Sequence, residues 1–142
     1  MSGLTAKNDF ERLGGEAGVR RIVENFTQQM FKDPMIGFFF HGKDKDRITE
    51  MEYRHAAEFL GGPVVYDGRP IAKTHRPLGI MGGQFLRRKK ILENTLREEG
   101  VAADISLRWL SHVDSFSNAV LGGRTQPGEC DHDDQTTRQN KG

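Results

Sequence analysis

Glycine-rich breaks divide the first 121 residues of this 142-residue chain into short segments, and their spacing constrains the fold most strongly. The breaks fall at Gly14-Gly15, Gly61-Gly62-Pro63, Gly82-Gly83 and Gly100. They are too frequent for a bundle of long helices, because glycine is a poor residue for a helix interior. No run of alternating apolar and polar residues between them predicts a strand. We therefore expect an all-α fold, built from short helices in one domain.

Four segments carry apolar residues at the spacing of an amphipathic helix. They are expected at Glu16–Phe31, from Asp44 or Asp46 to Leu60, at Gln84–Glu99 and at Asp104–Leu121. Either aspartate can cap the second helix. The run Phe38-Phe39-Phe40 falls in a turn-like connector between the first two helices. Three bulky rings there must either plug the core or contact a flat apolar ligand.

The last 21 residues differ in composition from the rest of the chain. Hydrophobic residues make up only 35% of the sequence, low beside the usual ~45–50%, although that scale also counts glycine. Between Gly122 and Gly142 the one hydrophobic residue is Cys130. Such a segment buries too little surface to offset its ordering entropy. We expect a foldable body over residues 1–121, whose small core a bound group would complete, and a disordered polar tail over residues 122–142.

Charge and cysteine content exclude several classes of partner. The formal net charge of +1 gives no electrostatic footprint for nucleic acid or an anionic membrane. No stretch is long and apolar enough for a membrane span, and residues 1–10 lack the apolar run of a signal peptide. Cys130 is the single cysteine, so no intramolecular disulfide forms, and with His132 alone it offers too few ligands for zinc. A cytoplasmic location is expected.

The second predicted helix places two polar side chains on or beside its apolar stripe, Glu52 and His55. Such violations of the hydrophobic pattern tend to gather at functional sites. Glu52-Tyr-Arg-His55 matches the Glu-x-x-His motif of di-iron helix bundles, which also require a second such motif and further glutamates on facing helices. The other predicted helices carry no second copy, so the sequence disfavours a di-iron site.

Five short motifs follow one another between residues 10 and 80. They are Phe10-Glu-Arg-Leu-Gly-Gly-Glu16, Asp33-Pro-Met-Ile-Gly-Phe-Phe-Phe40, Leu60-Gly-Gly-Pro63, Tyr66-Asp-Gly-Arg-Pro70 and Thr74-His-Arg-Pro-Leu-Gly-Ile80. With Phe85 and Gly100-Val101, this pattern resembles the truncated haemoglobins, and is most similar to group I, the cyanoglobin-like branch. The resemblance covers residues 10–121. It implies a two-over-two helical sandwich around haem b that reversibly binds a diatomic gas, namely oxygen, nitric oxide or CO.

The resemblance also assigns roles to individual residues. It implies that His75 is the proximal ligand of the haem iron, a role that suits a neutral imidazole. It implies that Phe40 packs on the porphyrin face, and that Phe26 and Trp109 wall the cavity. Candidates for binding the haem propionates are Tyr66, Arg47, Lys73 and Arg76. For the three cations, ordinary solvation at the surface is the competing interpretation.

On the distal side the sequence departs from the pattern of group I. Thr27 stands where the family usually has a tyrosine, Glu52 where it often has glutamine, and Ile48 at an apolar gate position. An ionised carboxylate only accepts hydrogen bonds, whereas a protonated Glu52 would donate one. Met51 is a candidate sixth iron ligand or a packing residue. His55 could pair with Glu52 or reach the iron itself, and we expect it to pack or to pair with Glu52.

Two other functions remain open from the sequence. Glu52 with Thr27 could relay protons in peroxide chemistry, which would make the chain a peroxidase-like or nitric-oxide-detoxifying haem enzyme. The other alternative is a haem-free, globin-like interaction module. The expected partners of the first interpretation are a diatomic gas and a possible reductase, and the expected assembly is a monomer or weak dimer.

Overall fold

The computed structural model describes residues 7–66, 80–117 and 121. Within them the chain forms helices and no strand, which confirms the all-α prediction. The elements are α1 (Asp9–Arg12), α2 (Gly15–Lys32), the 3₁₀ helix η2 (Gly37–Phe40), α3 (Lys45–Leu60), α5 (Gly82–Glu98) and α6 (Ala103–Asp114). No described helix is both long and apolar enough to cross a membrane.

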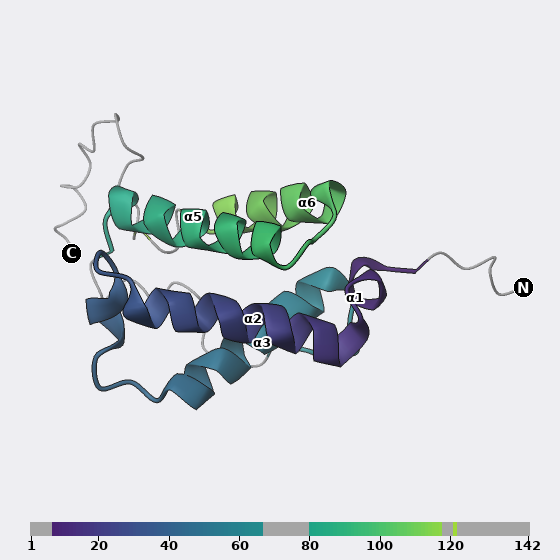
Figure 1. Ribbon diagram of the computed structural model, residues 1–142, viewed down its shortest axis with the longest axis horizontal. Helices are drawn as coiled ribbons and strands as arrows, with labels where there is room; N and C mark the ends of the chain where they lie inside the picture. Colours follow the sequence, from purple (N-terminus) through teal and green to yellow (C-terminus); the bar gives the residue numbers. More distant parts are fainter. Residues whose placement is uncertain (1–6, 67–79, 118–120, 122–142) are drawn as a thin grey trace, which may run out of the picture.

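The helices form two layers, as the two-over-two prediction requires. Figure 1 shows α2 crossing α3 in one layer and α5 lying beside α6 in the other. The central helix is α2, which packs against both α3 and α5. Its apolar stripe is buried along its whole length, from Val19 through Ile22, Val23 and Phe26 to Met30.

Close approach of α1 to α2 depends on Gly18. A Cβ atom built at this position would overlap the carbonyl oxygen of Leu13. The short helix α1 was not predicted as a separate element. Its N-terminal signal is nevertheless present in the sequence: Asn8 and Glu11 form a capping box, in which each side chain accepts a hydrogen bond from the other's backbone N–H.

The predicted helices agree with α2, α3 and α5 to within two residues. The cap of α3 is Asp44, whose Oδ1 accepts hydrogen bonds from the N–H groups of Asp46 and Arg47. The last predicted helix is interrupted: α6 ends at Asp114, the chain turns at residues 115–116, and Ser117 and Leu121 are helical again. At the turn the Ser115 hydroxyl donates to the carbonyl oxygen of His112, a local bond that competes with helix continuation.

A charged network joins the first helix to the last one. Arg108 on α6 donates to both carboxylate oxygens of Asp9 on α1, at 2.9 and 3.0 Å. Arg12 on α1 donates to both oxygens of Asp104 on α6, at 2.7 and 3.0 Å. Two-point contacts of this kind fix geometry better than single surface ion pairs do.

Two leucines distinguish the buried core from the surface. Leu96 on α5 is 1% exposed, whereas Leu107 on α6 is 70% exposed. We expect Leu96→Ala to lower the free energy of unfolding by about 2–5 kcal/mol, because it removes buried methyl groups and leaves a cavity. Leu107→Ala should change it by less than ~0.5 kcal/mol. Urea denaturation followed by circular dichroism measures both values, and equal losses would contradict this core assignment.

Candidate functional site

A cavity of about 410 Å³ lies between the two layers of helices, within the usual size range of small-molecule pockets. Eight of the side chains predicted for the site line it. They are Phe26, Phe40, Arg47, Ile48, Met51, Glu52, Tyr66 and Trp109. Positions spread from α2 to α6 are therefore brought to one place by the fold.

The remaining predicted site residues are not among the lining. Thr27 is fully buried, and its Oγ1 finds no hydrogen-bond partner among the described residues. His75, Lys73 and Arg76 lie in segment 67–79, outside the residues that the structure describes.

The phenylalanine run divides between the cavity and solvent. Phe39 and Phe40 line the cavity, whereas Phe38 is exposed. Phe40 stacks on Phe31 of α2, with ring centroids 4.6 Å apart and planes inclined by 19°. Phe39 and Phe40 also pack against the buried core. The run therefore contributes to the core and at the same time supplies aromatic faces to the cavity wall.

The buried carboxylate of Asp33 stabilises the turn that leads into the phenylalanine run. The Asp33 side chain, only 3% exposed, accepts hydrogen bonds from the N–H groups of Met35 and Ile36 and from Arg87 on α5. The bond from Arg87, helped by the two backbone donors, holds the pKa of Asp33 below its ordinary value. This contact ties the turn before η2 to α5. Sequence reasoning missed it, because the partners are 54 residues apart.

Glu52 meets a cation inside the cavity. Arg88 of α5 donates from Nη2 to Glu52 Oε1 at 2.9 Å, and its guanidinium lies 4.9 Å from the ring centre of Phe26. The structure gives Glu52 no hydrogen bond with Thr27, with which it was expected to act. Arg88 is a site residue that sequence reasoning missed, since nothing in the run Arg87-Arg88-Lys89-Lys90 marks which cation points inward.

Two further cations line the cavity, Lys43 and Arg47. Neither forms an ion pair with any side chain in the described part of the chain, and both are exposed. Their ammonium and guanidinium groups therefore remain available to an anionic group at the mouth of the cavity. Lys43 was not singled out from the sequence.

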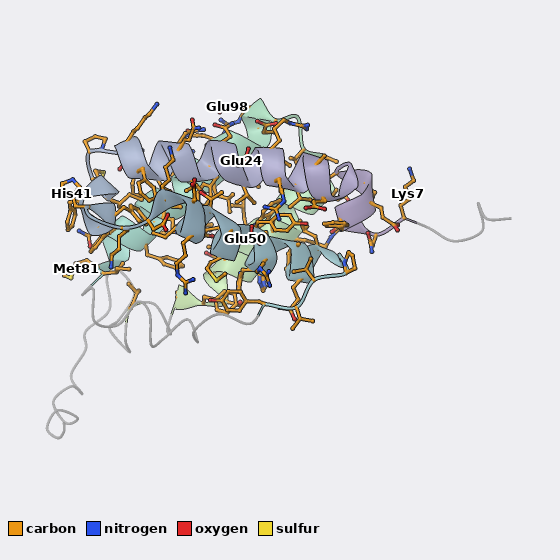
Figure 2. All side chains as sticks on the ribbon, turned by 90° about the horizontal axis from the view of Figure 1, so that it is seen from below. Lys7, Glu24, His41, Glu50, Met81 and Glu98 are labelled. Carbon is orange, nitrogen blue, oxygen red and sulfur yellow. The ribbon has the colours of Figure 1, made fainter. Side chains whose placement is uncertain are left out.

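Aromatic rings form the wall nearest α6. His55 lies edge-on to Tyr66 at 5.1 Å, and His112 stacks on Phe59 at 4.0 Å. Burial, helped by the neighbouring His55, lowers the pKa of His112. Both histidines line the cavity. His41, in contrast, is exposed and lies at the opposite end of the molecule from Lys7 (Figure 2).

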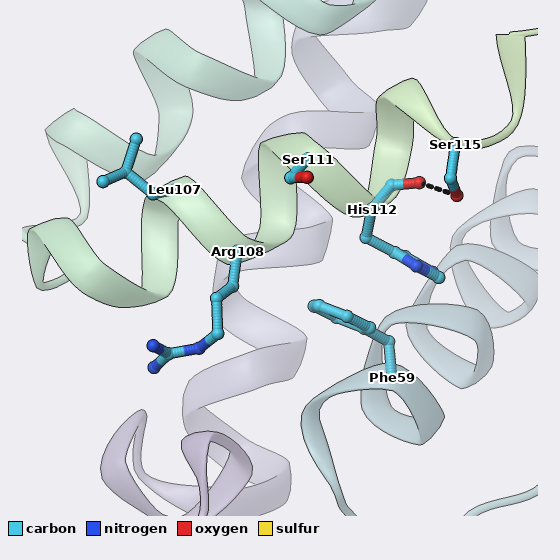
Figure 3. A pocket seen from close by; sticks show the side chains of 6 residues that line it. All are labelled: Phe59, Leu107, Arg108, Ser111, His112 and Ser115. Carbon is cyan, nitrogen blue, oxygen red and sulfur yellow. Dashed lines mark hydrogen bonds between the residues drawn. The ribbon is translucent and has the colours of Figure 1, made fainter.

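A second hollow, of about 450 Å³, lies on the outer side of this wall. Figure 3 shows it between α6 and Phe59 of α3, with His112 facing the phenylalanine ring. Its rim includes the exposed Leu107, and Arg108, which is already held by Asp9 and Asp104. We regard it as a surface groove and take the inner cavity as the candidate site.

Residues 8–121 match the family of bacterial-like globins. A group 1 truncated haemoglobin from Mycolicibacterium paratuberculosis is 30% identical over 114 residues, covering 80% of this chain and 84% of the relative. One from Tetrahymena pyriformis is 32% identical over 95 residues, covering 65% of this chain and 76% of the relative. This chain belongs to the group I truncated haemoglobins. The resemblance of its sequence motifs is thereby confirmed.

Solved structures of truncated haemoglobins have the same fold. The 2/2 haemoglobin of Synechococcus, solved in the cyanomet state with covalently attached haem, superposes with a TM-score of 0.77 at 25% identity. It covers 82% of this chain and 99% of its own. Chlamydomonas reinhardtii THB1 gives a TM-score of 0.72 at 28% identity, over 83% of this chain and 99% of its own.

Membership of the truncated haemoglobins implies a haem cofactor, and the residues present fit such a group. Haem is a flat apolar ring that carries two carboxylates. The cavity offers aromatic surface from Phe26, Phe40 and Trp109, and it offers Lys43 and Arg47 as cations without a described ion-pair partner. Apolar walls with a few placed polar groups are typical of cofactor sites.

The hydrogen bonds of Asp33 predict that the free energy of unfolding depends on pH. Because the pKa of Asp33 is lower in the folded chain, the unfolded chain binds its proton first as the pH falls. The stability contributed by Asp33 is fully present above its ordinary pKa of 3.8 and is lost below it. We expect Asp33→Asn to lower the free energy of unfolding by about 1–3 kcal/mol at pH 7, and by less at pH 3.5.

Urea denaturation at the two pH values measures this difference. Asp114→Asn is the matched control, because Asp114 also pairs with a cation, Lys89, but its side chain is 52% exposed. That variant should stay within ~0.5 kcal/mol of the parent. An Asp33→Asn loss that is the same at both pH values would contradict the assignment.

Proposed function

We propose that this truncated haemoglobin holds haem b in the cavity between its helical layers and reversibly binds a diatomic gas, oxygen or nitric oxide. The observation that carries the proposal is the cavity between the helical layers, which is lined by Phe26, Phe40 and Trp109 and by cations that have no ion-pair partner among the described residues, in a chain of this family. Bound haem supplies an iron that takes a protein ligand on one side and the gas on the other.

The proximal ligand in this proposal is His75. It rests on the motif Thr74-His-Arg-Pro-Leu-Gly-Ile80, which matches the family pattern, and on the ligand chemistry of neutral imidazole. His55 and His112 are the two described histidines that line the cavity. They are the alternatives that an experiment must exclude.

Cations and one phenol bind the propionates in this proposal. Lys43 and Arg47 line the cavity and lack a described ion-pair partner, and Tyr66 lines it as well. Lys73 and Arg76 are further candidates for binding the propionates, because they lie within two residues of His75 in the sequence. An Arg or Lys near a carboxylate makes a charge-assisted hydrogen bond, which is stronger than a neutral one.

The distal residues in this proposal include Ile48 and Met51, two residues of α3 that line the cavity. Ile48 gives the gas an apolar passage, and Met51 either packs or takes the sixth iron position. The lone Cys130 supports a cytoplasmic location in this proposal, and the expected assembly is a monomer or weak dimer. A reductase is its expected partner, because the gas binds to ferrous iron.

Substitution of His75 tests the proposal directly. We expect the wild-type chain reconstituted with haem to show a strong Soret band that shifts with CO. His75→Gly should lose the spectrum of imidazole-ligated haem, and added free imidazole should restore it by filling the space left by the side chain. The matched controls His55→Ala and His112→Ala should retain that spectrum.

Three results would count against the proposal. Unchanged ligation in His75→Gly, with loss in one of the two controls, would move the iron ligand to that histidine. Absence of any Soret band in the wild type would favour the haem-free interaction module. A Soret band that does not shift when CO is added to the ferrous protein would show that the iron is not accessible to a gas.

The carboxylate in the cavity supports a second candidate function, peroxide chemistry through Glu52. Proton relay by a positioned carboxylate is worth about 10²–10⁴-fold in rate. Because Arg88 already holds Glu52 in an ion pair, we expect peroxide consumption per haem in Glu52→Gln to stay within tenfold of the wild type. A loss of about 10²-fold or more would favour the peroxidase-like enzyme.

A further inference from the structure

Four consecutive cations on α5 take four different directions, because successive residues of a helix point about 100° apart. Three of them pair outside the cavity. The partners are Asp33 for Arg87, Asp114 for Lys89 and Glu93 for Lys90. Only the second cation of the run, Arg88, lines the cavity, where it bonds to Glu52.

Two contacts fix the Arg88 guanidinium in place. Glu52 accepts its Nη2 hydrogen bond at 2.9 Å, and the ring of Phe26 lies 4.9 Å away. The Arg88 side chain is 28% exposed, so the ion pair is partly shielded from water. A cation placed near an aromatic face and bonded to a carboxylate loses little further freedom when a third group binds.

This guanidinium retains unused donors. Arginine carries five N–H groups, and within the described residues Arg88 uses one of them, toward Glu52. An ionised Glu52 only accepts hydrogen bonds, and Thr27 does not line the cavity. Because Arg88 bonds directly to Glu52, it lies on the side of the cavity that the family pattern assigns to the distal ligand.

We propose that Arg88 is the hydrogen-bond donor to the ligand on the distal side of the haem, that Glu52 positions it, and that it selects ligands carrying negative charge. The inference rests on the proposed haem function. The ligand class is small anions, together with gases whose outer atom is partly negative. A charge-assisted bond from a fixed donor stabilises such ligands more than a neutral donor would.

Substitutions of Arg88 and of Glu52 should change the affinity for an anionic ligand in opposite directions. Removing Arg88 takes away the donor and its positive charge. Removing the charge of Glu52 leaves Arg88 in place with its charge uncompensated. A purely structural ion pair would give the same sign for both substitutions, since either one breaks the same bond.

Azide binding to the ferric, haem-reconstituted full chain tests the proposal. We expect Arg88→Met to weaken azide affinity about ten- to hundredfold, Arg88→Lys to retain part of it, and Glu52→Gln to strengthen it. Lys89→Met, the control, removes the same charge one residue away on the outside of α5 and should leave the affinity unchanged.

The C–O stretching frequency of the ferrous CO form gives a second readout. A positive charge beside bound CO lowers this frequency, so Arg88→Met should raise it and Glu52→Gln should lower it. Lys89→Met should leave it in place. These shifts report the electrostatic potential at the bound ligand.

The outcomes separate the two proposals. A wild-type chain that takes up no haem overturns the proposed function itself. A wild type that binds haem, with Arg88→Met unchanged in azide affinity and C–O frequency, overturns the role of Arg88 alone. Should Arg88→Met fail to take up haem, equal azide affinities for the wild type, Arg88→Lys and Glu52→Gln would overturn it as well.

Discussion

The buried apolar stripe of α2 is the constraint on which the rest of the structure depends. This helix contacts α3 in its own layer and α5 in the other, so its side chains set the distance between the layers. Val19, Ile22 and Met30 on this stripe are at most 1% exposed and belong to the buried core. At Val23 and Phe26 the same stripe borders the cavity instead. One helix face therefore both holds the core together and forms the wall of the site.

Sequence reasoning predicted the parts of this structure that depend on local patterns. Apolar spacing located α2 and α3, and the motif resemblance collected eight side chains that line one cavity. The errors have local causes too: α1 is only four residues long, and a hydroxyl bond from Ser115 accompanies the early end of α6. The pairing of Arg88 with Glu52 was not predictable, because periodicity does not show which cations of α5 meet which acids of another helix.

The cations that line the cavity are of two kinds: some have no described ion-pair partner, and one is paired with a carboxylate. Lys43 and Arg47 are exposed and have no described ion-pair partner, which suits them to an anionic group that arrives with the cofactor. Arg88 is compensated by Glu52 and held near Phe26, so it can act on a ligand without leaving an isolated charge in the interior. In the two proposals made above, the cofactor and its ligand are thus bound by different cations.

The contact between the two ends of the fold has a kinetic consequence. Arg108 and Asp9 are 99 residues apart in the chain, and Arg12 and Asp104 are 92 apart. Closing so long a loop is entropically costly until the helices between have assembled. We therefore expect these two ion pairs to form late in folding, and interactions absent from the transition state mainly slow unfolding. On this expectation they lengthen the lifetime of the native state and leave the folding rate nearly unchanged.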